Sequence, residues 1–447
     1  MAESHKPRPP LHTILPPLLL GTATFNSQYV SDPESMPYRD IVARAISLGV
    51  TGFDTSPYYG PSETLLGTAL NALLKPTDGS SPPVSRKSLF LVTKAGRIAP
   101  TEFDYSPSWV RYSVLRSLRR LHTPYLDLVY MHDVEFVSAD EVVAAVRELR
   151  RLRDEEKVIR YVGISGFPVD VLCSLAEKVL KETGEGLDAV LSYGHFTVQN
   201  RKLGLPWVDQ PNGEDQGQEN EGSLLARFKK AGVQVVLNAS ILGMGLLTSR
   251  GIPTDPPEKA TSASPSPLAK WHPSPPELRL ACKDLAALAE QAGERLESVA
   301  IRWSLAEWAR VGGAAGLGVN VSMLDGGETC RVGSTVCGVT SVPELEETVA
   351  EWRGVLRSIQ NSSSGGAGED DAYGSARQEK VLDLVRNKLW PALGSWLDYA
   401  WDSPGKGYKN TRNESDRGVV PDDGVIEEYE KAKQERQGAE GSVPEAR

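Results

Sequence analysis

The chain has 447 residues, of which 40% are hydrophobic and 24% are charged, and its formal net charge at pH 7 is −10. This balance is typical of a globular protein with a large buried core and excludes a disordered or fibrous chain. Because the charge is acidic and no long Lys/Arg cluster occurs, we expect no nucleic-acid partner and favour a small-molecule ligand.

Two further features concern location and metal binding. The apolar stretch at residues 16–24 is interrupted by prolines and is too short to span a bilayer. It also lacks a signal-peptide cleavage site, so we expect a cytoplasmic protein with no membrane partner. The cysteines form no CxxC pair and have no His at zinc-site spacing, so we expect reduced thiols and no metal site. They are Cys173, Cys282, Cys330 and Cys337.

Short apolar runs alternate with helical patterns from about residue 16 to about residue 358, which is typical of βαβ units in a parallel sheet. The stretch 106–121, for example, repeats apolar residues at three- and four-residue spacing, as a helix covering a barrel strand does. Eight such runs predict a (β/α)8 TIM barrel, with the active site at the carboxyl ends of the strands. The predicted strands are 18–23, 52–56, 89–96, 126–133, 161–167, 189–196, 233–242 and 334–339.

Several segments do not fit this repeat. The predicted loop insertions are 205–222, 253–276 and 312–328, and 362–371 is predicted to be a flexible surface excursion. Residues 384–401 keep three tryptophans, so we expect this segment to pack back on the barrel and the barrel unit to cover residues 1–401. Residues 402–447 are polar and charged without a helical stripe, which predicts an irregular, disordered tail.

Ionisable and phenolic residues stand at the ends of consecutive predicted strands: Asp54, the pair Tyr58 and Tyr59, Lys94 and His132. Each alone is more often structural, because a buried Asp caps turns, a Tyr packs in the core and a strand Lys forms an ion pair. In a barrel, however, the strand ends meet at one mouth. The set therefore predicts a proton-transfer site, in which Lys94 lowers the pKa of a tyrosine, Asp54 balances Lys94, and His132 orients a substrate oxygen.

The same residues carry a family resemblance. The segments TGFDTSPYYGPSE, FLVTKAG, LDLVYMHD and YVGISGF resemble, in order, the aldo-keto reductase superfamily, whose first motif reads G-x-x-x-F-D-T-A-x-x-Y-G. The family's catalytic Tyr stands five residues after the Asp, so the resemblance implies a tetrad of Asp54, Tyr59, Lys94 and His132. It also implies hydride transfer between a nicotinamide and a carbonyl or alcohol carbon, with Tyr59 as general acid or base.

The resemblance implies cofactor contacts as well. Ser165 and Gly166 stand where the family has Ser-Asn at the carboxamide, and Ser192 lies near a family Gln. Ala239 replaces the aromatic that stacks on the nicotinamide, and Tyr193 is the expected substitute. The remaining candidates, for the pyrophosphate and adenosine ends, are Ser240, Leu242, Gly245, Gly338, Glu344, Glu347 and Thr348.

The carboxylate of Glu344 favours NAD over NADP, because it would repel a 2′-phosphate and can accept from a ribose hydroxyl. The alternative interpretation of Glu344 is an ordinary acidic helix start. No GxGxxG motif is present, which is consistent with a family that does not bind its cofactor in a Rossmann unit.

Within the family, DTSPYYG, HDVEF and NASILGMGLLT resemble the branch of NAD-dependent sugar dehydrogenases that oxidise D-arabinose or L-galactose at C1 to a lactone. We favour D-arabinose as the substrate. Two alternatives stay open at this point: an NADPH-dependent aldehyde or pyridoxal reductase, and a non-catalytic barrel that binds nucleotide and regulates a partner.

Overall fold

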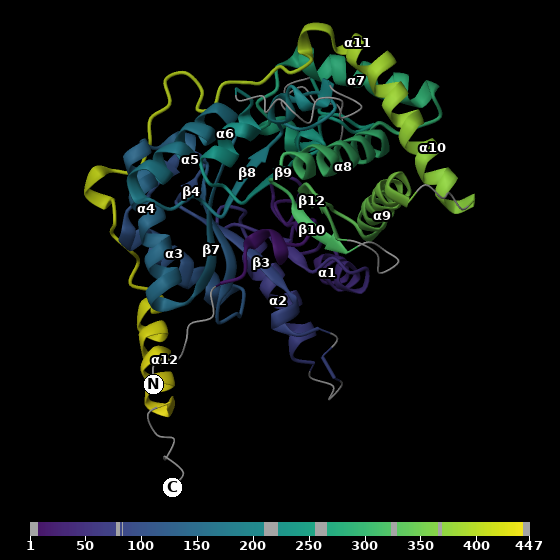
Figure 1. Cartoon of the computed structure of the whole chain (residues 1–447). Helices are drawn as coiled ribbons and strands as arrows, with labels where there is room; N and C mark the ends of the chain where they lie inside the picture. Colours follow the sequence, from purple (N-terminus) through teal and green to yellow (C-terminus); the bar gives the residue numbers. More distant parts are fainter. Residues whose placement is uncertain are drawn as a thin grey trace.

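The computed structural model describes residues 8–76, 81–82, 84–209, 222–254, 266–322, 329–364 and 369–440. At its centre, eight parallel strands close into a barrel in the order β1, β12, β9, β8, β7, β6, β3, β2 (Figure 1). All eight predicted strands are confirmed. They are β1 (Leu18–Gly21), β2 (Gly52–Asp54), β3 (Phe90–Ala95), β6 (Leu126–His132), β7 (Ile159–Gly166), β8 (Ala189–Tyr193), β9 (Val235–Ala239) and β12 (Ser334–Gly338).

Helices surround this barrel, as the alternating pattern predicted (Figure 1). The apolar stripe of the helix α3 (Pro107–Arg120) is buried against the strands, with Val110, Val114 and Leu115 each at most 3% exposed. The fold is therefore a (β/α)8 TIM barrel. The helices that follow the strands are α1 (Tyr38–Ser47), α2 (Ser62–Leu74), α3 (Pro107–Arg120), α4 (Ala139–Arg151), α5 (Val169–Thr183), α6 (Leu224–Lys230), α7 (Pro276–Gln291), α8 (Leu296–Ala314) and α9 (Val342–Ser364).

The strand register decides which residues share the mouth of the barrel. Lys94 pairs with Tyr130, two positions before His132, and His132 pairs with Ser165 on β7. Ser192 pairs with Gly166 on one side and with Asn238 on the other. Because all these strands run in the same direction, their carboxyl ends form one rim.

The predicted insertions are only partly within the described residues. Of 205–222, residues 210–221 lie outside them, and of 253–276, residues 255–265 do. The end of the second insertion forms the short helix η9 (Pro267–Lys270) before α7. Of the predicted excursion 362–371, residues 365–368 lie outside the described residues, between α9 and α10 (Glu369–Leu384).

The prediction of a loop insertion at 312–328 was wrong at both of its described ends. Residues 312–314 complete α8, and residues 319–322 form β10, which pairs with β11 (Thr329–Val332) as an antiparallel hairpin. A side chain at Gly313 would collide with the carbonyl oxygen of Arg331. The glycines therefore allow the helix end to pack closely on the hairpin, and their number suggested a loop.

The segment 384–401 lies against the barrel. It contains a π-helical turn at Val385–Leu389, then α11 (Trp390–Leu393) and a short turn at Gly394–Trp396. The Trp390 indole donates to the carbonyl oxygen of Val198 at 3.0 Å. Trp401 stacks on Phe167, just beyond the end of β7, with ring centroids 4.8 Å apart and an interplanar angle of 10°.

The chain beyond residue 401 differs from the predicted disordered tail. Residues 402–424 contain only a short turn at Glu414–Asp416, but α12 (Val425–Glu440) follows, contacts α3 with its first turns and projects beyond it (Figure 1). The tail is fixed to a small hairpin of β4 (Arg97–Ala99) and β5 (Glu102–Phe103). Asn410 exchanges two hydrogen bonds with the backbone of Phe103, at 3.0 and 2.8 Å. Polar contacts and a few scattered apolar ones, such as those of Tyr408 and Val425, hold this segment, and they leave no apolar stripe in the sequence.

Candidate active site

A buried ion pair lies at the centre of the barrel mouth. Lys94 on β3 donates from Nζ to Oδ1 of Asp54 on β2 at 2.6 Å, and also to the carbonyl oxygen of Thr55 at 3.0 Å. Both residues of the pair are at most 4% exposed. Each charge therefore depends on the other, because an unpaired buried charge is strongly unfavourable. The predicted pairing of Asp54 with Lys94 is present.

Tyr59 and His132 complete the group. The Lys94 nitrogen lies 4.9 Å from the centroid of the Tyr59 ring. The Tyr59 and His132 rings are perpendicular, with centroids 5.6 Å apart. The four predicted side chains, from β2, the turn after it, β3 and β6, are therefore brought together at one end of the barrel.

The expected effect of Lys94 on Tyr59 is not found. Burial raises the pKa of Tyr59 well above that of a free phenol, and the Asp54 carboxylate raises this pKa further. The physical reason is that the Lys94 ammonium is already paired with Asp54, so the two charges largely cancel at the phenol. Tyr59 is therefore a neutral phenol in the protein on its own.

The two nitrogens of the His132 ring have different neighbours. Its Nδ1 lies 3.0 Å from Oγ of Ser56, and its Nε2 lies 3.6 Å from Oδ2 of Asp133. Asp133 adopts a left-handed conformation, with φ of 57°, that turns its carboxylate back toward the ring. Burial lowers the pKa of His132 to about 3; Asp133 opposes this shift, and Lys94 and Arg97 add to it. The imidazole is thus neutral.

Sequence reasoning missed three ionisable residues at the mouth: Arg97, Asp133 and Glu135. Arg97 forms an ion pair with Asp133 and donates to the hydroxyl of Tyr58 at 3.1 Å. Burial raises the pKa of Glu135 to about 8. These residues could have been noticed because they stand close to Lys94 and His132 in the sequence. The sequence does not show, however, that Arg97 turns back toward β6.

The predicted carboxamide site is only partly supported. Ser165 donates to the carbonyl oxygen of Met131 at 3.2 Å, and a Cβ at Gly166 would lie 2.5 Å from Oε2 of Glu135. The space beside Gly166 is therefore filled by another side chain. In contrast, Ser192 Oγ and Asn238 Oδ1 are buried with no hydrogen-bond partner among the described residues. These two atoms, at paired positions of β8 and β9, fit a polar group of a ligand.

The predicted pyrophosphate loop forms a tight turn after β9. Ser240 has a positive φ of 57°, and the N–H groups of Gly243 and Gly245 donate to the carbonyl oxygens of Ser240 and Leu242 at 2.7 and 3.2 Å. A Cβ at Gly245 would lie 2.5 Å from Cδ1 of Leu268 in the second insertion. The N–H groups of Gly243 and Gly245 therefore stabilise the turn itself, and they are not directed at an anion.

At the end of β12, the predicted adenosine residues separate into different roles. Glu344 is exposed and accepts hydrogen bonds from the N–H and hydroxyl of Thr340 at 2.7 and 3.0 Å, so it caps the start of α9. Glu347 forms an ion pair with Arg295, the N-cap residue of α8. Gly338 is exposed beside Thr24. Only Glu344 and Gly338 are thus placed to meet a ligand.

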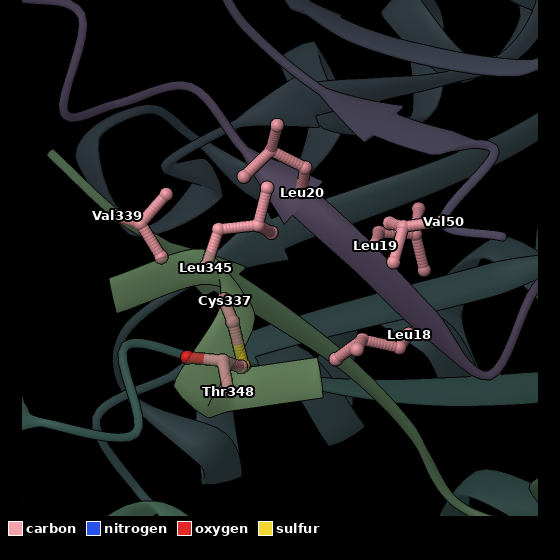
Figure 2. Close-up of a pocket in the computed structure, with 8 residues that line it drawn as sticks. All are labelled: Leu18, Leu19, Leu20, Val50, Cys337, Val339, Leu345 and Thr348. Atoms are coloured by element: carbon pink, nitrogen blue, oxygen red, sulfur yellow. The ribbon is translucent and has the colours of Figure 1, made fainter. Parts of the chain in front are cut away.

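Thr348, the last of these candidates, lines a small cavity between β1, β12 and α9 (Figure 2). The other lining residues are apolar, and the volume is about 10 Å³, no more than one water molecule needs. The cavity is a packing gap behind the barrel wall, so Thr348 is separated from the mouth. The lining residues are Leu18, Leu19, Leu20, Val50, Cys337, Val339, Leu345 and Thr348.

Within the ranges given above, no helix has both the length and the apolar character needed to cross a bilayer. Among the same residues, no group of three or more His, Cys, Asp or Glu side chains is arranged to hold a metal ion.

The fold and the strand-end side chains together define an oxidoreductase built on a (β/α)8 barrel. The profile of the Aldo/keto reductase family matches residues 17–362, so the chain belongs to this family, which uses nicotinamide cofactors. The chain is 40% identical over 294 residues to D-arabinose 1-dehydrogenase of Saccharomyces cerevisiae, covering 65% of this chain and 76% of that protein. It is 32% identical over 354 residues to L-galactose dehydrogenase of Arabidopsis thaliana, covering 78% and 86%.

Among solved structures, a glycerol dehydrogenase from Gluconobacter oxydans is similar over 90% of this chain and 98% of that chain, with 21% identity and a TM-score of 0.49.

The neutral state of His132 predicts a pH dependence of stability. Because burial lowers its pKa from 6.5 to about 3, the unfolded chain binds a proton between these values that the folded chain does not. The contribution of His132 to the free energy of unfolding is therefore fully present above pH 6.5 and decreases as the pH falls toward 3. We expect the wild type to lose about 2 kcal/mol more than His132→Gln in unfolding free energy between pH 7 and pH 5, measured with urea. Equal losses in the two proteins would contradict a buried neutral imidazole.

Proposed function

We propose that the protein oxidises an aldose, with D-arabinose favoured, at C1 to the lactone with NAD. The observation that carries this proposal is the convergence of Tyr59, Lys94, Asp54 and His132 at one mouth, around the buried 2.6 Å ion pair. The names of the yeast and plant relatives, which are aldose dehydrogenases acting on arabinose and galactose, support the choice of substrate class.

In this proposal, Tyr59 takes the proton from the anomeric hydroxyl. Burial favours the neutral phenol, so Tyr59 must first reach the phenolate, and the positive charge of Arg97, which lowers the pKa of Tyr59, favours that state. Neutral His132 donates a hydrogen bond to the same substrate oxygen and orients it. The nicotinamide, when bound, supplies the acceptor for the hydride that leaves C1.

The residues that would hold the cofactor are those with unused polar groups at the rim. Ser192 and Asn238 offer buried oxygen atoms without described partners. Glu344 is exposed beyond β12, near the place proposed for the ribose, and a carboxylate side chain at this place favours NAD. Glu344 also caps α9 by accepting hydrogen bonds from Thr340, so one side chain would serve both as a helix cap and as a cofactor contact.

The second candidate is an NADPH-dependent aldehyde or pyridoxal reductase. One observation favours it: the raised pKa of Tyr59 keeps the phenol protonated, which is the state that a carbonyl reduction needs. A non-catalytic barrel that binds nucleotide is the third possibility, and only turnover can separate it from the other two.

The deciding experiment is incubation of the purified protein with a panel of aldoses and either NAD or NADP, following reduced nicotinamide by absorbance. We expect turnover to be fastest with D-arabinose and NAD. Faster consumption of NADPH with aldehydes or pyridoxal would favour the reductase. If neither direction shows turnover, while nucleotide still binds, the regulatory barrel is the better interpretation.

The role of Tyr59 predicts a large effect of removing one oxygen atom. We expect Tyr59→Phe to lower kcat by about 10²- to 10⁴-fold, because the proton acceptor is lost while the ring stays in place. Tyr58→Phe is the matched control, since the neighbouring Tyr58 hydroxyl accepts from Arg97 but is not assigned the proton transfer. Full turnover by a correctly folded Tyr59→Phe would show that the assignment is wrong.

The proposed preference for NAD can be tested at Glu344. We expect Glu344→Gln to tighten NADP binding about three- to tenfold, because the repulsion of the 2′-phosphate is removed while the amide oxygen can still accept from Thr340. Binding is measured by quenching of tryptophan fluorescence. Glu346→Gln, which removes an exposed charge paired with Arg44, is the control for net charge. An identical change in both variants would mean that Glu344 has no specific role.

A further inference from the structure

We propose that Ser56 is a positioning residue that fixes His132 in the neutral tautomer with the proton on Nε2. In that tautomer the Nε2–H group is available to a substrate oxygen. This inference rests on the proposed function only for the statement that His132 donates to a substrate oxygen. It concerns a residue outside the tetrad, and the family motif has Ala where this chain has Ser56.

The hydrogen bonds of the Ser56 hydroxyl determine which nitrogen of His132 carries the proton. Ser56 is fully buried. Its Oγ accepts a hydrogen bond from the backbone N–H of Tyr58 at 3.1 Å and lies 3.0 Å from Nδ1 of His132. A hydroxyl has one hydrogen to donate and two lone pairs to accept. Since one lone pair is used by Tyr58, the contact with His132 decides where the hydroxyl hydrogen goes.

The two tautomers of His132 differ in how they satisfy this hydroxyl. If Nδ1 is unprotonated, the Ser56 O–H donates to it, and both groups are satisfied. If Nδ1 carries the proton, it donates to Ser56, and the Ser56 hydrogen is left without an acceptor among the described residues. A buried donor without a partner is unfavourable, so the first arrangement is preferred. It places the ring proton on Nε2.

The charges on the other side of the ring favour the same arrangement. The Asp133 carboxylate lies 3.6 Å from Nε2, too far for a short hydrogen bond but close enough to attract a proton to that nitrogen. Arg97 is paired with the same carboxylate, and the Lys94 ammonium is nearby, so a second proton on the ring is disfavoured. Burial acts in the same direction and lowers the pKa of His132 to about 3.

The ring is also held in orientation. The Tyr105 hydroxyl donates to the backbone carbonyl of His132 at 2.6 Å, which fixes the end of β6. The rings of Tyr58 and Tyr59 contact the imidazole edge-on, with centroids 5.8 and 5.6 Å away. These contacts oppose a rotation that would exchange the two nitrogens, so the proton position set by Ser56 is kept.

The test is a measurement of the tautomer by NMR in protein labelled with ¹⁵N-histidine. The signals of His132 are identified by their loss in His132→Gln, because the chain has six histidines. In the wild type we expect Nδ1 at the frequency of an unprotonated nitrogen and Nε2 at that of an N–H, with no change between pH 5.5 and 8.5. In Ser56→Ala we expect both frequencies to move toward each other, and Ser56→Thr should restore them.

A matched control is Ser117→Ala, which removes a buried serine hydroxyl that donates to the carbonyl oxygen of Ser113 on α3. This variant should leave the His132 signals unchanged. In turnover, we expect Ser56→Ala to lower kcat about three- to tenfold, with the cofactor affinity unchanged. A wild-type spectrum with the proton on Nδ1, or a Ser56→Ala spectrum identical to wild type, would overturn the proposal. The spectra decide this even if the panel of sugars shows no turnover.

Discussion

The mouth of the barrel depends on the buried ion pair between Lys94 and Asp54. Neither charge is stable there alone, so β2 and β3 must lie side by side in the correct register for either residue to remain charged. The pair also determines the electrostatic potential at the neighbouring side chains. The Lys94 ammonium is already paired with Asp54. Burial therefore affects the pKa of Tyr59 more than positive charge does, and the phenol keeps its proton. The site is therefore prepared to donate a proton, and it needs further positive charge to accept one readily.

A second ion pair stands on the other side of His132. Arg97 neutralises Asp133, which would otherwise favour an imidazolium so close to Nε2. The imidazole thus lies between two paired sets of charges, and burial decides its protonation state. This explains how a histidine beside a carboxylate can stay neutral and act as a hydrogen-bond donor over a wide pH range. The left-handed backbone of Asp133 is needed for this arrangement, because it turns the carboxylate back toward the ring that precedes it.

The barrel and the positions of the four central residues were predictable from the sequence, for a simple reason. Strands that are buried on both faces appear in the sequence as short apolar runs. A polar residue at the carboxyl end of such a run must lie at the mouth of the barrel. The partners of these residues were not predictable in the same way. Arg97 reaches Asp133 only because a small hairpin follows β3, and Ser56 reaches His132 only through the shape of the turn after β2. Gly312 and Gly313 suggested a loop because close packing and loops both require glycine.

The C-terminal tail shows how a segment without an apolar stripe can still support the mouth. Asn410 holds the backbone of Phe103 in the hairpin that begins with Arg97, and the Tyr408 ring packs edge-on against Phe103 and Phe136. The Arg97 guanidinium lies over the same two phenylalanine rings, at 5.5 and 5.6 Å from their centroids.

The tail therefore supports, from outside, the layer of rings on which Arg97 rests while it neutralises Asp133. A single hydrogen bond of this kind contributes only about 0.5 to 1.5 kcal/mol to stability. The effect of these contacts is to limit the positions open to the hairpin, and through Arg97 and Asp133 that restriction extends to the ring of His132. A mostly polar tail, with Val425 its one fully buried apolar residue among those described, can in this way maintain the geometry of a buried site.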